Sequence, residues 1–111
     1  MHEMSITQGI IDICEQYAGG RRVFSIDVEI GELSSVVPDA VVFCFEACSQ
    51  DTLLQGARLN IIRIPGSGHC LDCDVDTPLT AIFGSCQTCG SYQVKIVSGE
   101  EMRVREIEVD E

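Results

Sequence analysis

The chain has 111 residues, of which 45% are hydrophobic, so we expect a folded domain with a small appendage rather than a disordered chain. Its formal net charge of −11 argues against nucleic acids and anionic membranes as partners, because both attract lysine and arginine. The first residues lack the basic stretch of a signal peptide, and no apolar run is long enough to span a bilayer, so a cytoplasmic protein is expected.

A first helix is predicted over residues 4–18, where apolar side chains recur at helical spacing. Ser5 followed by Gln8 fits a capping box, which would satisfy the unpaired backbone N–H groups at the helix start. Gly19 follows the last apolar position and predicts the helix end.

A strand and a second helix are predicted next. Residues 22–30 alternate between apolar and polar side chains, which is typical of a half-buried strand. Its apolar face consists of Phe24, Ile26, Val28 and Ile30. Residues 38–50 fit a helix, in which Pro38 suits the first position and Asp39 suits the positive end of the helix dipole.

Two further segments, residues 57–64 and 101–109, have the pattern of strands. The alternation of the last segment changes phase near Arg105 and Glu106, which predicts a β-bulge there. Three strands and two helices in this order predict an α+β fold, with a three-stranded mixed sheet packed against the two helices on one face.

The segment between the last two strands differs in composition, because it is rich in cysteine and in small polar residues. Glycines flank it on both sides and favour a flexible joint. We therefore predict two domains. Residues 1–65 plus 101–111 form the α+β domain, and residues 66–100 form an inserted zinc-ribbon domain.

Four of the seven cysteines form a CxxC…CxxC pattern with twelve residues between the pairs, namely Cys70, Cys73, Cys86 and Cys89. Two such turns can direct four thiolates to one ion, and a complete thiolate set favours structural Zn²⁺. Rubredoxin-like iron and a redox dithiol are the alternatives. Gly90 suits the tight turn after the second pair, and Asp74 stands at the equivalent place after the first. His69 is interpreted as a solvated loop residue, with a ligand role as the alternative.

The N-terminal triplet Met1-His2-Glu3 can chelate a metal ion. The α-amine and the amide and imidazole nitrogens of His2 can close fused rings on one ion, and Glu3 can add an amide or carboxylate donor. Such nitrogen donors suit Ni(II) and Cu(II). On composition alone, however, a histidine at a chain start is more often without a function. We expect the initiator Met1 to be retained before the bulky His2.

Segments along the whole chain, taken in order, resemble the HypA family of nickel-insertion accessory proteins for hydrogenase and, in some organisms, urease. They are MHEMSI, IGELSSV, FCFEA, GARLNI, the paired CxxC and EMRVREIEV. The resemblance implies that His2 is the principal nickel ligand, aided by Met1 and Glu3, and that the four cysteines hold zinc. It also implies a HypB-type GTPase and the hydrogenase large subunit, or another nickel enzyme, as partners. Asp39 matches the place of an acidic residue proposed to act in some members.

The residues predict a carrier rather than an enzyme, because we find no activated serine, no Cys–His pair at a predicted cleft and no phosphate-binding glycine loop. Together with what the resemblance to the HypA family implies, this predicts a nickel metallochaperone with Ni²⁺ as cargo and a structural Zn²⁺. Two rival functions are a zinc-ribbon interaction adaptor without transported metal and a thiol redox protein. Both account for the four cysteines, but neither accounts for the N-terminal triplet.

Overall fold

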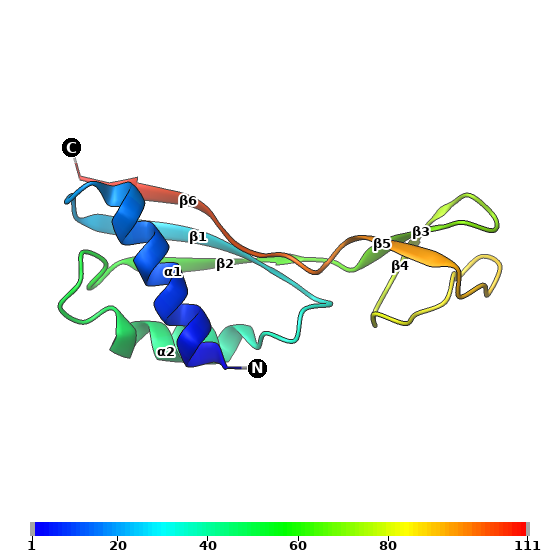
Figure 1. Ribbon diagram of the computed structural model, residues 1–111, viewed down its shortest axis with the longest axis horizontal. Coiled ribbons are helices and arrows are strands. Elements are labelled where there is room, and N and C mark those ends of the chain that lie inside the picture. The colour runs from blue at the N-terminus through cyan, green and yellow to red at the C-terminus, as the bar shows by residue number, and fades with distance from the viewer. Residues whose placement is uncertain (1, 111) are drawn as a thin grey trace. The chain divides into compact units, whose positions relative to one another are not determined.

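The computed structural model describes residues 2–110 and divides them into two compact units, each built around its own sheet (Figure 1). The helical unit comprises the described residues up to Glu29, Val36–Ile62 and the described residues from Arg103 onward. The cysteine unit comprises Ile30–Ser35 and Arg63–Met102. None of the helices in the described part of the chain has the length and apolar character needed to cross a bilayer.

The first helix, α1, spans Glu3–Ala18 and begins earlier than its sequence pattern predicts. The backbone N–H of Ile6 donates to the carbonyl of His2 at 3.1 Å, so His2 caps the helix and Ser5 already lies inside its first turn. The predicted capping box at Ser5 is therefore wrong. At the other end, Gly19 has a φ of 61°, and this left-handed conformation ends the helix as predicted.

The second helix, α2, spans Pro38–Cys48, with Pro38 in its first turn as predicted. It ends two residues earlier than expected, at a cap formed by Ser49. The two helices pack against each other, and the side chains that they bury are mainly aliphatic. The buried apolar residues of the two helices are Ile10, Ile11, Cys14, Ala18, Val41 and Phe45.

A three-stranded sheet with the order β2-β1-β6 completes the α+β architecture (Figure 1). Its strands are β1 (Val23–Gly31), β2 (Arg58–Ile64) and β6 (Met102–Val109). On β1, Ile26, Val28 and Ile30 are fully buried as predicted. Phe24, the second residue of the strand, is 45% exposed, whereas its neighbour Val23 is fully buried, so the prediction that Phe24 is buried is wrong.

Strand β6 runs antiparallel to β1, and the pairing of the two strands changes phase along its length. Gly31 donates its N–H to the carbonyl of Glu101 at 2.7 Å, and Asp110 donates to Arg22 at 2.9 Å. In a regular antiparallel pair, only every second residue of a strand bonds to the same neighbour. Gly31 and Arg22 are an odd number of positions apart, yet both bond to the segment that contains β6, so the ladder is irregular between them. The half-buried residues of β6 also change phase at Arg105 and Glu106, and a β-bulge there stays a prediction.

The cysteine unit contains a second, small sheet with the order β4-β3-β5. Its strands are β3 (Ser67–Cys70), β4 (Asp76–Pro78) and β5 (Val94–Ser98), and β3 is antiparallel to both neighbours. Gly66 and Gly68 allow neighbouring segments to pack close to the backbone of β3 and of the residue before it. A Cβ on Gly68 would lie 2.4 Å from a methyl group of Val94, and one on Gly66 would lie 2.2 Å from the carbonyl oxygen of Leu79. The α+β fold class with a separate four-cysteine ribbon is therefore confirmed.

Candidate metal centres

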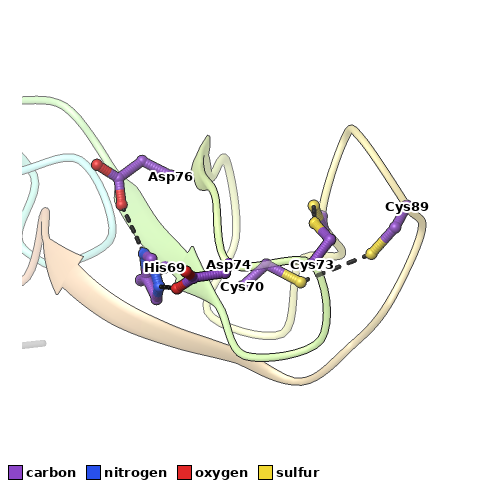
Figure 2. Close-up of polar contacts among 7 residues, drawn as sticks. His69, Cys70, Cys73, Asp74, Asp76 and Cys89 are labelled. Carbon is purple, nitrogen blue, oxygen red and sulfur yellow. Dashed lines mark hydrogen bonds and ion pairs between the residues drawn. The ribbon is translucent and has the colours of Figure 1, made fainter.

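The four paired cysteines converge at one end of the small sheet. Their sulfur atoms all lie within 4.8 Å of one another, with 3.6 Å between Cys70 and Cys89 and 3.7 Å between Cys73 and Cys86 (Figure 2). Four sulfurs bound to zinc at ~2.3 Å in a tetrahedron would be separated by about 3.8 Å. The donor set therefore fits a tetrahedral ion with little rearrangement.

Both cysteine pairs are shaped by the same backbone turn. The N–H of Asp74 donates to the carbonyl of Cys70 at 3.0 Å, and the N–H of Gly90 donates to the carbonyl of Cys86 at 2.8 Å. Asp74 and Gly90 both have positive φ angles, 58° and 76°. Asp is one of the few residues other than glycine that enter this region without large strain, so Asp74 can take the place in the first turn that Gly90 has in the second.

Burial, neighbouring sulfurs and backbone N–H groups shift the pKa values of the cysteine thiols in opposite directions. Loss of solvent contact, together with hydrogen bonds to the other sulfurs, raises the pKa of Cys73 to about 12. By contrast, the backbone N–H groups of Cys89 and Thr88 lower the pKa of Cys86 to about 6. Four thiolates cannot coexist at such short distances without a positive charge between them, and a divalent metal supplies that charge.

The sulfur–sulfur distances do not fit disulfides, because a disulfide bond is ~2.05 Å long. All seven cysteines are free thiols in the structure, with Cys14 buried in the core of the helical unit. The geometry therefore favours four ligands that surround one ion over a redox pair.

His69 lies outside the sulfur group. Its Nδ1 is 2.8 Å from a carboxylate oxygen of Asp76 and its Nε2 is 2.7 Å from one of Asp74, as Figure 2 shows. The hydrogen bonds to Asp76 and then to Asp74 raise the pKa of His69. Because both ring nitrogens have carboxylate partners, His69 links Asp76 to Asp74 and so stabilises the backbone turn between Cys70 and Asp74. Sequence reasoning missed this pair of contacts.

The predicted nickel residues lie at the start of α1, and Met1 lies outside the described residues. His2 is exposed and caps the helix, and Glu3 is the first helical residue. A carboxylate oxygen of Glu3 accepts a hydrogen bond of 3.4 Å from the N–H of Val37, next to the first turn of α2, which contains Asp39. No local sequence signal could have indicated this contact, because it joins residues 34 positions apart.

A second contact between the helices joins their sulfur-containing residues. The sulfur atoms of Cys48, the last residue of α2, and Met4, in the first turn of α1, are 3.0 Å apart. Together with the Glu3 contact, it attaches the first turn of α1 to α2 through two side chains.

Comparison with known proteins identifies the family. Residues 1–109 match the family described as hydrogenase/urease nickel incorporation, metallochaperone, hypA. Hydrogenase maturation factor HypA of Geobacter metallireducens is 58% identical over 110 residues, which cover 99% of this chain and 100% of the relative. The protein of the same name from Geobacter sulfurreducens is 56% identical with the same coverage.

A solved structure is similar over almost the full length. The solution structure of the Ni metallochaperone HypA from Helicobacter pylori has a TM-score of 0.70 and 31% identity. The match covers 98% of this chain and 97% of that chain. Fold, cysteine cluster and sequence therefore lead to one conclusion: the chain belongs to the HypA family of hydrogenase and urease nickel-incorporation metallochaperones.

Proposed function

We propose that this chain is a nickel metallochaperone that binds Ni²⁺ at its N-terminus and assists nickel insertion into hydrogenase, or into urease where that is the client. The full-length match to the nickel-incorporation family carries this conclusion. Its chemistry is that of a carrier, which must bind the ion and release it to a second protein.

The proposed nickel ligands are Met1 through its α-amine, His2 through its amide and imidazole nitrogens, and Glu3. The position of the triplet supports this assignment, because the first backbone N–H groups of an α-helix have no acceptor within the helix. The amide nitrogens of His2 and Glu3 can therefore bind a metal without breaking helical hydrogen bonds. The exposed His2 side chain lies next to them.

For the four-cysteine group we propose a structural Zn²⁺, held by Cys70, Cys73, Cys86 and Cys89. The tetrahedral sulfur distances and the shared backbone turns support zinc. Four protein ligands leave no open position for a substrate, so the ion would stabilise the cysteine unit and take no part in a reaction. Residues 66–100 would then form a zinc-dependent domain.

The proposed partners are a HypB-type GTPase, which would act with the carrier, and the hydrogenase large subunit or another nickel enzyme, which would receive the metal. The net charge of −11 supports protein partners over nucleic acid or an anionic membrane. The free thiols would remain reduced in the cytoplasm, which is the proposed location.

The nickel site can be tested with three forms of the zinc-loaded protein: the native chain, His2→Ala, and a chain with a short tag fused before Met1. We expect both altered forms to lose tight nickel binding in calorimetric titrations, because each removes a nitrogen donor. Both should keep their zinc and their circular dichroism spectrum, since the His2 side chain is exposed and lies outside the core. Binding should also weaken as pH falls, because protons compete with the metal for nitrogen donors.

His69→Ala is the matched control, because the chain contains only two histidines. It should retain tight nickel binding, since the proposed nickel ligands lie in the N-terminal triplet. If the tagged form binds nickel as well as the native chain, the α-amine is not a ligand. If His2→Ala also binds normally, the N-terminal site is wrong and the zinc-ribbon adaptor becomes the better proposal.

A further inference from the structure

Most of the aromatic side chains of this chain lie on its surface. The chain has four Phe and two Tyr, and among them only Phe45 is buried. In the cysteine unit, Phe83 is 89% exposed and Tyr92 is 75% exposed. Exposed aromatic side chains that gather on one surface are typical of protein interfaces, where they supply much of the binding energy.

Phe83 and Tyr92 belong to one hollow, which we call the ribbon pocket. It has a volume of about 340 Å³ and is lined by Ile82, Phe83, Gly84, Tyr92, Val94 and Ile96. The loop that carries Phe83 packs close to the core of the unit, because a Cβ on Gly84 would lie 3.0 Å from a methyl group of the buried Leu79. The pocket is thus an apolar hollow on a supported loop and strand.

The pocket lies beside an unpaired strand edge. In the small sheet, β5 has β3 as its only neighbour among the described strands. An edge strand exposes backbone N–H and C=O groups that can pair with an added strand. Val94 and Ile96 line the pocket, so an extended segment that pairs with β5 would place alternate side chains near it.

The charge of the cysteine unit selects the kind of segment. This unit has six acidic residues but only two basic ones, Arg63 and Lys95. The acidic residues are Glu32, Asp72, Asp74, Asp76, Glu100 and Glu101. A second copy of this chain would bring a further net charge of −11 and would be repelled. A basic segment would instead be attracted.

We propose that the ribbon pocket binds an extended, basic segment of a partner protein. One large apolar side chain of the segment enters the pocket, its backbone pairs with β5, and its lysine or arginine side chains face the acidic surface of the cysteine unit. This interaction requires neither nickel nor the N-terminal triplet. It is therefore independent of the nickel site described above.

The test uses the zinc-loaded full chain and two fluorescent synthetic peptides of equal length. Both contain a central Val-Phe-Val, flanked by lysines in one peptide and by glutamates in the other. We expect the lysine peptide to bind at least tenfold more tightly in anisotropy titrations, with weaker binding at higher salt. In NMR spectra of the labelled protein, binding should shift the amide signals of β5.

The double variant Phe83→Ser with Tyr92→Ser should weaken binding of the lysine peptide at least tenfold, because it removes both exposed aromatic walls of the pocket. Val97→Ser is the matched control, since Val97 is an exposed apolar residue on the same strand that does not line the pocket. It should bind the peptide like the native chain. Zinc content and circular dichroism should be unchanged in both variants.

Three results would overturn the proposal: no binding of the lysine peptide, equal binding of both peptides, or undiminished binding by the double variant. Light scattering provides a fourth such result. If the native chain is a dimer and the double variant is a monomer, the ribbon pocket binds a second copy of this chain instead of a basic segment. Nickel titration of the same samples reports separately on the N-terminal site, so failure of one proposal can be distinguished from failure of the other.

Discussion

Gly66 shows how a single residue position constrains the cysteine unit. A Cβ at this position would lie 2.2 Å from the carbonyl oxygen of Leu79 and 2.8 Å from Leu33. Because the closest atom belongs to the backbone, a side-chain movement cannot relieve the clash. We expect Gly66→Ala to lower the free energy of unfolding of this unit by about 1–3 kcal/mol, measured by urea denaturation.

Gly9→Ala is the control for this prediction, because a Cβ on Gly9 meets no atom within 4 Å and the residue lies inside α1. It should stabilise the helical unit by about 0.5–1 kcal/mol, since alanine loses less backbone entropy in a helix. If Gly66→Ala unfolds at the same urea concentration as the native chain, the result contradicts the close packing of Leu79 and Leu33 against Gly66.

Cys14 links burial of a single thiol to the pH dependence of stability. Burial raises the pKa of Cys14 to about 11 from an ordinary value of 9.0. Between these values the unfolded thiol loses its proton while the folded thiol keeps it, so the unfolded state binds fewer protons. The contribution of Cys14 to stability should therefore be complete below about pH 9 and should fall as pH rises towards 11.

This dependence can be measured by comparing urea denaturation of the native chain and Cys14→Ala at several pH values. The difference in stability between the two proteins should shrink as pH rises through this range, because alanine has no proton to lose. Other titrating groups are common to both proteins and cancel in the comparison. A difference that stays constant up to pH 11 would contradict burial of this thiol.

At the scale of elements, the two cysteine turns hold a sheet whose strands are too short to be stable alone. Strand β3 has four residues and β4 has three. If zinc supplies most of the folding energy of this unit, Cys73→Ala should lose the metal and unfold β3, β4 and β5. The helical unit should survive, because its core consists of its own apolar residues.

Cys48→Ala provides the matched control for Cys73→Ala, since Cys48 lies in α2 and outside the four-sulfur group. It should retain one equivalent of zinc and the native NMR signals of the cysteine unit. Metal analysis and NMR spectra would report both outcomes. An iron-coloured protein, or complete loss of zinc without a structural change, would argue against a structural zinc site.

At the scale of the whole molecule, charge determines which partners are excluded. A chain with a net charge of −11 carries only seven lysine and arginine residues to neutralise phosphates. We therefore expect no binding to duplex DNA at physiological salt in a gel-shift assay, although many zinc ribbons bind nucleic acid. A shifted band at that salt concentration would count against a protein-directed function.

Local sequence patterns determined the main elements of this protein. The periodicity of apolar residues predicted both helices and the three strands of the larger sheet, because a side chain's place on a helix or strand depends on its own spacing. The CxxC spacing likewise predicted that four sulfurs converge, since each turn is closed by residues that are close in the sequence. The exact start of α1 was mispredicted, because Ser5 signals a cap that His2 provides instead.

Contacts between distant residues were decided only by the tertiary structure. The hydrogen bond from Val37 to Glu3 and the hollow between Phe83 and Tyr92 depend on how separate elements pack. The pattern of residues 22–30 likewise assigned Phe24 to the buried face, but burial requires neighbours that a strand pattern does not contain. The sequence by itself thus determined the two helices, the strands of the larger sheet and the grouping of the four cysteines, whereas packing decided the small sheet and which surfaces the elements leave exposed.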